Sequence, residues 1–421
     1  MKNKLTGILV TGLALGTAWA VRGHFGHEQG AAWAGTIGAL AMVLVSGRKD
    51  WYQKIFPVAL SAALGWGATG MISYGIVVGY GRSTSFVNAL YGLSMLFVIG
   101  GLFGLLGGGL AGLSLESTKE KKVKWAGLIS EMVAGGLITY GFLVLHLDLL
   151  MTPPRSEAWA LCLGGGLAMI WYMARHNYRS SLRVALFSAL GAGFGFAFGN
   201  FLQILGNVLE INFNMWNVME YSIGFFGGSA FAYSVFSSRW PETDARPKPW
   251  ENRAAFLILF VFVPLIVFRQ SLGYNILLNR LKDVTNSENL VLLSSLFAAL
   301  VMAAAALTVW LRMEKTKFCF QRRDVFLFFI LCLSVYIAIS YIVSGIFAGK
   351  SHLNIHLYVL NLFVILLLVR KQASPFSAQP VSGINYKKLT GYVFAIIVVI
   401  AILALIAVNI HGELGGAHDR F

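Results

Sequence analysis

Residues 5–46 read LTGILVTGLALGTAWAVRGHFGHEQGAAWAGTIGALAMVLVS, two apolar stretches separated by the segment Arg22-Gly-His24-Phe-Gly-His27-Glu28. Each stretch is long enough to cross a membrane as a helix, which takes about 20 residues. The separating segment holds four ionisable side chains and two glycines. Charged groups beside lipid are costly unless they are paired, hydrated or buried in protein. The stretch therefore predicts a transmembrane helical hairpin with a functional polar site at its turn.

Apolar stretches of this length recur along the whole chain. Hydrophobic residues make up 57% of the 421 residues and charged residues only 12%, and the mean hydropathy is +0.70. This composition predicts an all-α polytopic membrane protein, because backbone groups in lipid must be satisfied within each segment. About thirteen transmembrane helices are predicted, near 4–21, 29–46, 55–80, 86–114, 124–147, 157–174, 182–206, 216–237, 254–271, 289–311, 325–348, 353–369 and 389–410.

The basic residues predict the topology. The chain has 33 Lys and Arg residues and a net charge of +15. With the N-terminus inside and the C-terminus outside, most of them fall on the cytoplasmic side. The outer side receives only Arg22, Arg82, Arg155, Arg269, Arg280, Lys282, Lys350 and Arg420. The positive-inside rule explains this asymmetry without a nucleic-acid partner. We expect a multi-pass protein of a bacterial plasma (inner) membrane, with the lipid bilayer as its partner.

The first apolar segment allows a second interpretation. Lys2 and Lys4, the apolar run and the Ala18-Trp19-Ala20 segment also fit a cleaved signal peptide, which would leave twelve spans. Gly12 and Gly16 favour a retained helix, because small residues four apart let membrane helices pack closely.

Glycine divides the chain into two parts. Of the 46 glycines, 38 precede residue 240. We predict a Gly-rich transmembrane domain of about four helix hairpins at 1–238, carrying the outer-facing polar site. A cytoplasmic Pro-rich linker follows at 239–253, and then an apolar bundle of about five helices at 254–421. This bundle is a candidate surface for a homo-oligomer.

Polar residues gather at the predicted outer ends of the first eight helices. Arginine presents a rigid fork of donors to anions, acids at helix starts are favoured by the helix dipole, and amides bind hydroxylated ligands. For single arginines, snorkelling or pairing with a nearby acid is a simpler role. Together these side chains predict one outward-facing pocket for a small anionic or hydroxylated molecule, formed by Arg22, His24, His27, Glu28, Arg82, Asp148, Arg155, Asn200, Asn217 and Glu220.

His24, His27 and Glu28 also raise the question of a metal site. Imidazoles three residues apart share one face of a helix, but the glycines at 23 and 26 indicate a loop, and the segment is not HExxH. We therefore expect no metal and no other cofactor.

Two functions fit the pattern. The first is a transporter of a small anionic or sugar-like solute, since glycine-interrupted helices around a polar cavity are typical of transporters. The second is a membrane-embedded transferase or hydrolase at the outer leaflet. In that enzyme His24 or His27 would be the base, Glu28 its orienting partner and Arg22 the stabiliser of developing negative charge. A non-catalytic assembly subunit is a third interpretation.

Overall fold

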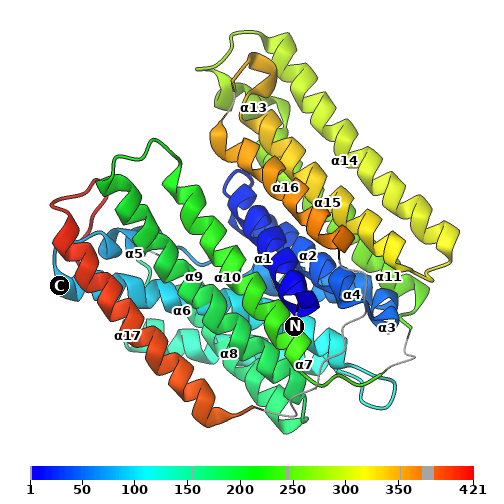
Figure 1. Cartoon of the computed structure of the whole chain (residues 1–421), viewed down its shortest axis with the longest axis horizontal. Helices are drawn as coiled ribbons and strands as arrows, with labels where there is room; N and C mark the ends of the chain where they lie inside the picture. Colours follow the sequence, from blue (N-terminus) through cyan, green and yellow to red (C-terminus); the bar gives the residue numbers. More distant parts are fainter. Residues whose placement is uncertain (1, 154, 243–245, 351, 372–383) are drawn as a thin grey trace.

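The protein is built from helices throughout the part of the chain that the structure describes. The computed structural model describes residues 2–153, 155–242, 246–350, 352–371 and 384–421 (Figure 1). No β-strand occurs in these ranges. The prediction of an all-α fold is confirmed.

The first part of the chain contains ten α-helices and one π-helical segment. They are α1 (Lys2–Arg22), α2 (His27–Ser46), α3 (Lys49–Gln53), α4 (Ile55–Gly70), α5 (Gly75–Gly81), α6 (Phe86–Glu116), α7 (Trp125–Tyr140), η1 (Gly141–His146), α8 (Glu157–Arg175), α9 (Arg179–Val208) and α10 (Met215–Ser237). The later helices are α11 (Pro249–Phe256), η2 (Leu257–Phe262), α12 (Val263–Val267), η3 (Phe268–Leu272), α13 (Tyr274–Leu281), α14 (Glu288–Thr316), α15 (Arg322–Val343), η4 (Ile346–Ala348), α16 (Leu353–Lys371) and α17 (Tyr386–Ile410).

Eleven helices are long and apolar enough to cross a membrane, or twelve if the bent pair α4 and α5 forms one span. Two of the thirteen predicted spans differ from this set of helices. The predicted span 55–80 is not one continuous helix, because α4 and α5 meet at an angle of 70° across residues 71–74. The predicted span 216–237 is the helix α10, which is not among the eleven; it contains the polar residues Asn217, Glu220 and Ser222.

Six helices form a closed ring. In the order α1, α2, α4, α6, α9 and α10, each helix packs against the next, and α10 returns to α1 (Figure 1). Trp66 of α4 lies inside this ring, since it contacts Trp19 of α1 and packs against glycines of three further helices, Gly35, Gly107 and Gly227. The first half of the chain thus surrounds a central axis.

Glycine brings the ring helices into close contact. A β-carbon at Gly12 of α1 would collide with Ser229 of α10, and one at Gly16 would be in tight contact with Phe225. A β-carbon at Gly104 of α6 would collide with the backbone of Ser188 in α9. Such close approach provides the packing that lipid does not drive. The packing role predicted for Gly12 and Gly16 is confirmed. Helix α1 thus forms one wall of the ring, between α2 and α10.

The remaining helices surround the ring on different sides. The hairpin of α7 and α8 packs through α8 against α6 and α9, whereas α11, α12, α15 and α16 pack against α1, α2 and α4. Helix α17 lies apart from these and packs on α6 and α9 (Figure 1). The single bundle predicted for 254–421 therefore does not include α17. Residues 243–245 of the predicted linker lie outside the described residues, and α11 already begins at Pro249.

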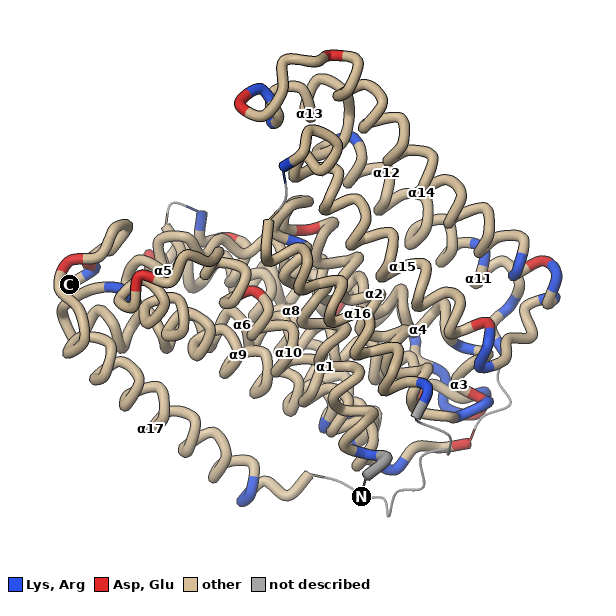
Figure 2. Tube along the Cα trace, turned by 45° about the horizontal axis from the view of Figure 1, so that its top comes forward, with Lys and Arg blue, Asp and Glu red and all other residues tan. Residues whose placement is uncertain are grey.

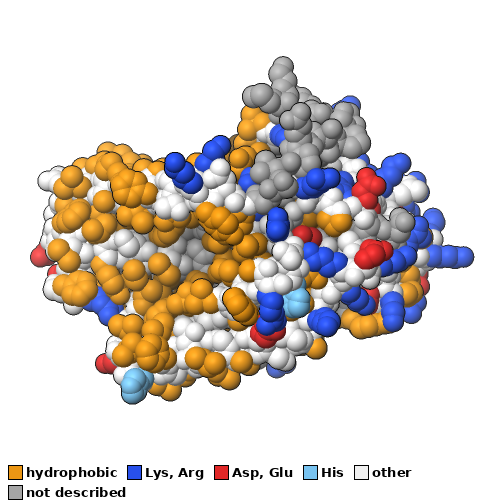
Figure 3. Space-filling model, turned by 90° about the horizontal axis from the view of Figure 1, so that it is seen from below, with side chains coloured by type: hydrophobic (Ala, Val, Ile, Leu, Met, Phe, Trp, Pro, Cys, Tyr) orange, Lys and Arg blue, Asp and Glu red, His pale blue; other side chains and the backbone are white. Residues whose placement is uncertain are grey.

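The two ends of the helices differ in charge. We call the end that holds Arg48, Lys49 and Lys54 the basic end. Lys and Arg gather there, around α3 and α11, and a space-filling view shows them apart from a broad hydrophobic surface (Figures 2 and 3). The opposite end holds the turn between α1 and α2 and the break between α4 and α5. This end carries the polar site.

Candidate functional site

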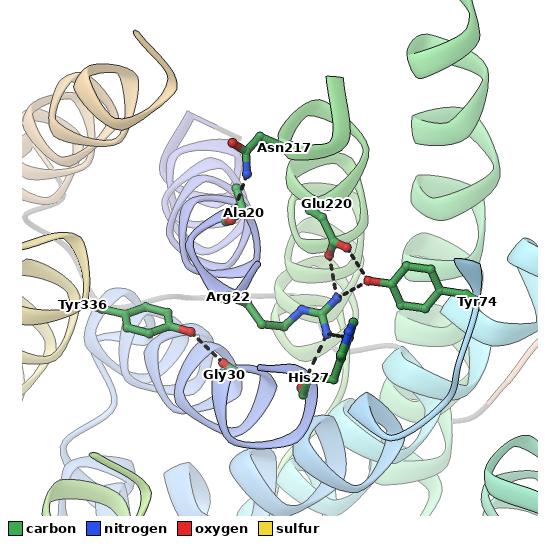
Figure 4. Close-up of polar contacts among 8 residues, drawn as sticks. All are labelled: Ala20, Arg22, His27, Gly30, Tyr74, Asn217, Glu220 and Tyr336. Carbon is green, nitrogen blue, oxygen red and sulfur yellow. Dashed lines mark hydrogen bonds and ion pairs between the residues drawn. The ribbon is translucent and has the colours of Figure 1, made fainter. Parts of the chain in front are cut away.

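A buried ion pair joins the first helix of the ring to the last. Arg22 ends α1 and Glu220 lies one turn into α10, and these residues are 1% and 5% exposed. The Arg22 Nη2 atom donates to the Glu220 carboxylate at 2.8 Å and to the Tyr74 hydroxyl at 2.7 Å (Figure 4). Tyr74 in turn donates to the other Glu220 oxygen at 2.5 Å. Buried charges of this kind are stable only when they are paired and hydrogen-bonded, as they are here.

Arg22 also fixes the protonation pattern of His27. The Arg22 Nη1 atom lies 3.2 Å from the Nδ1 atom of His27, which begins α2. Because a guanidinium only donates hydrogen bonds, Nδ1 must be the accepting nitrogen and the proton of the neutral ring sits on Nε2. Glycine makes this geometry possible, since Gly26 before His27 has a φ of +91° that other residues rarely adopt.

Helices outside the ring hold this site from behind. Asn217 of α10 donates to the Ala20 carbonyl at 3.1 Å and accepts from Asn354 of α16. Tyr336 of α15 donates to the Gly30 carbonyl of α2 at 3.1 Å (Figure 4). The second half of the chain therefore contributes to the site, although sequence analysis described it as a plain apolar bundle.

The network borders a cavity of about 550 Å³. It is lined by the turn between α1 and α2, the break between α4 and α5, the segment before α8 and the start of α10. Its charged groups are Glu28, Arg155 and Glu220, with Arg22 directly behind the wall. Positive and negative charges therefore balance. Trp216 is 43% exposed and offers an aromatic surface in the same cavity.

An aromatic layer closes the ring beneath the network. Phe196 packs against Tyr74 at 5.0 Å between ring centroids and against Phe103 at 6.0 Å. Trp19 packs against Phe103 at 5.3 Å and against Trp66 at 4.8 Å. All these side chains are buried. The polar cavity thus opens at one end of the ring and stops at aromatic residues on the axis.

The ten predicted site residues separate into three groups. Seven of them line this cavity or stand directly behind it, namely Arg22, His24, His27, Glu28, Arg155, Asn217 and Glu220. Arg82 and Asn200 lie elsewhere, with Arg82 in a second cavity and Asn200 hydrogen-bonded to Gln203 in its wall. Asp148 is exposed in the loop after η1 and lines neither cavity. The one pocket predicted from the sequence is therefore two pockets.

Tyr74, Trp216 and Asn354 were missed by sequence analysis. Tyr74 was placed inside the continuous span 55–80, although Gly70 and Gly75 on either side could have indicated a break. Trp216 stood beside a predicted site residue and could have been included as an aromatic surface. Nothing in the sequence connects Asn354 to Asn217, which lies 137 residues away.

His24 lies under the segment that contains α13. Arg280 of α13 donates to the His24 carbonyl at 3.1 Å. Burial, together with the charges of Arg280 and His352, lowers the pKa of His24 to about 4. Within the described ranges, no three His, Cys, Asp or Glu side chains are grouped to hold a metal ion. The metal interpretation of His24, His27 and Glu28 thus gains no support.

Comparison with known proteins leaves the site as the main guide to function. The chain matches no protein-family model, no curated protein and no solved structure.

Proposed function

We propose that this protein is a membrane transporter of a small hydroxylated solute, with the cavity as its binding site and the six-helix ring as its pathway. The observation that carries this proposal is the position of the cavity. It ends on the Arg22, Tyr74 and Glu220 network inside a closed ring, directly above an aromatic layer. A binding site in that position, closed on one side, is what one state of an alternating-access transporter requires.

The cavity chemistry favours hydroxylated solutes. Its charges balance, so they provide little net attraction for an anion. Trp216 and Tyr74 provide aromatic surfaces, while Asn217, Glu28 and Glu220 provide hydrogen-bonding groups. A few polar groups beside aromatic walls are typical of small-molecule sites.

The direction of opening follows from charge. The cavity lies at the end of the helices opposite the basic end, and basic loops favour the cytoplasmic side. The proposal therefore includes a plasma membrane location, with the cavity open to the outside.

An enzyme at the outer leaflet is a second candidate, favoured by the fact that the cavity stops at the aromatic layer. The role of base suits His27 poorly, since Arg22 occupies its Nδ1 atom and Nε2 carries the proton. His27 in this state donates a proton and does not accept one.

Uptake by purified protein in lipid vesicles tests the proposal. We expect accumulation of labelled glucose or glucuronate, and faster uptake into vesicles that were preloaded with the same unlabelled sugar. Glu220→Gln removes the charge that balances Arg22 and should abolish uptake. Glu131→Gln is the matched control, because Glu131 pairs with Arg175 in a solvent-exposed ion pair. Chemical conversion of the sugar without accumulation would instead support the enzyme.

A further inference from the structure

A second cavity lies next to the first and shares residues with it. Its volume is about 450 Å³, and Asn214 and Trp216 line both cavities. The side chains that distinguish it are Arg82, which follows α5, and Gln203 of α9. Cavities of this size fall within the usual range of small-molecule sites.

The second cavity is lined by buried donors that lack partners. Arg82 is 8% exposed and Gln203 is 1% exposed. The Arg82 Nη1 atom donates to the Gly415 carbonyl at 2.9 Å, but its Nε atom has no hydrogen-bond partner among the described residues. Gln203 accepts from Asn200 at 3.2 Å, while its Nε2 atom likewise lacks a partner in the described part of the chain. A buried donor without a partner costs about 1 to 3 kcal/mol, so a ligand oxygen that displaced the local packing and reached these atoms would be stabilising.

The charge of this cavity differs from that of the first. Arg82 is the only charged residue in its described lining. The nearby carboxylate of Asp419 is engaged by Ser83 and by Asn88. One guanidinium without a balancing acid matches one negative charge, and its fork of donors suits a carboxylate. The start of α10 at Met215 also lines this cavity and adds the positive end of a helix dipole.

Trp216 belongs both to the hydroxyl-binding first cavity and to the second cavity that holds Arg82. It is half-exposed, lines both cavities, and lies under the Arg82 guanidinium at 5.4 Å from its ring centroid. A solute held against Trp216 would border both cavities, with hydroxyl-binding groups in the first and the Arg82 guanidinium in the second. We propose that the second cavity is an acid-binding subsite, so that the solute is a hydroxylated monocarboxylate of the hexuronic acid type. This inference rests on the proposed function for the first cavity.

Binding to the purified full-length protein tests the subsite separately from transport. Titration of tryptophan fluorescence with glucuronate, glucose and glucose 6-phosphate compares a carboxylate, a neutral and a phosphate form of one sugar. We expect glucuronate to bind about tenfold more tightly than glucose, which corresponds to about 1.4 kcal/mol. Equal affinities for glucuronate and glucose, or no binding of glucuronate, would overturn the subsite. Tighter binding of glucose 6-phosphate would overturn the choice of a carboxylate.

Two variants locate the effect. Arg82→Gln removes the charge, and Gln203→Glu places a carboxylate beside Arg82 without changing the size of the side chain. Both should lose the preference for glucuronate while retaining glucose binding, which also shows that the variants are folded. Equal weakening of both sugars, or an unchanged preference, would contradict the proposal.

Arg420→Gln is the matched control. Arg420 belongs to the C-terminal segment that Arg82 contacts at Gly415. It donates to the Leu150 carbonyl and does not line the cavity. We expect the preference for glucuronate to survive in this variant. Its loss would show that Arg82 acts by holding the C-terminal segment, and would overturn the subsite.

The binding measurement tests the subsite, and the uptake measurement tests the transporter, so the two proposals can be rejected separately. A preference for glucuronate without uptake would contradict the transporter and retain the subsite. Uptake of both sugars that does not change in Arg82→Gln would retain the transporter and reject the subsite.

Discussion

The ring and the helices around it use the same residue types in different ways. Gly104 in the ring packs directly on the backbone of α9, whereas Gly391 on α17 has no atom within 4 Å of the position of a β-carbon. The ion pair of Arg22 and Glu220 is buried in the ring, whereas Arg253 and Glu314 form an exposed pair between α11 and α14. In these two comparisons the ring has the closer packing and the buried ion pair. Outside the ring, Gly135 and Gly164 also pack closely between α7 and α8, and Asp324 is a buried acid that pairs with Arg312.

The surrounding helices still reach the site at a few points. Asn354 binds Asn217, Tyr336 binds the Gly30 carbonyl, and Asn361 donates to Thr17 and Tyr221 at 3.2 Å. These contacts hold α1, α2 and α10 from outside the ring. The contrast between the two regions can therefore be tested with paired substitutions, one in each region.

The largest expected effect is at the buried ion pair. Arg22→Met leaves the Glu220 carboxylate buried without its cation, and we expect a loss of about 3 to 5 kcal/mol in the free energy of unfolding. Arg253→Met breaks the exposed pair and should cost less than about 1 kcal/mol. Chemical unfolding of the purified variants in detergent measures both values.

A double variant checks the cause of that effect. Because removing both charges leaves no uncompensated charge, Arg22→Met combined with Glu220→Met should be more stable than Arg22→Met alone. A double variant less stable than the single one would show that packing around Arg22, and not the lone charge, explains the loss.

The next largest loss of stability is expected where a close-packed glycine of the ring is replaced. Gly104→Val would force α6 away from the backbone of Ser188, and overpacking of this kind costs about 1 to 3 kcal/mol or more. Gly391→Val faces open space and should leave the stability nearly unchanged. Thermal unfolding of the two variants compares them, and equal losses would contradict the distinction between ring and outer helices.

The turn of the first hairpin and most of its partners could be predicted from the sequence. Counting spans and locating the basic loops placed Arg22, His27, Asn217 and Glu220 at one end of the helices, where the structure brings them together. The order of helices around the ring could not be predicted, because contacts such as the one between Arg22 and Glu220 join residues 198 positions apart.

Tyr74 and Arg82 were misplaced because the sequence pattern does not show how loops and helix breaks pack. Residues 55–80 are apolar enough to read as one span, so the break that presents Tyr74 to Arg22 was hidden. Arg82 was assigned to the first pocket because topology gives only the end of a helix, not the direction in which its loop packs. Its interactions with Gly415 and Trp216 place it in the second cavity instead.

A smaller effect is expected where an outer helix supports the site. Asn354→Leu removes the donor that Asn217 accepts from, and a buried oxygen left unpaired costs about 1 to 3 kcal/mol. Asn409→Leu is the control, because Asn409 is exposed and bonds only to its own helix at Leu405 among the described contacts. In Asn354→Leu we expect weaker sugar binding and a lower free energy of unfolding. Similar binding and stability in the two variants would reject the supporting role of α16.

The last expected effect appears only at low pH and concerns the turn between the ring and α13. Burial holds the pKa of His24 at about 4 in the folded protein, against an ordinary value of 6.5. The unfolded chain therefore takes up a proton first as the pH falls, so the stabilisation from neutral His24 is complete above pH 6.5 and is lost towards pH 4. We expect the melting temperature to fall more across this window in the wild-type protein than in His24→Gln, because glutamine takes up no proton. Parallel pH profiles for the two proteins would show that burial and the charges of Arg280 and His352 do not keep His24 neutral.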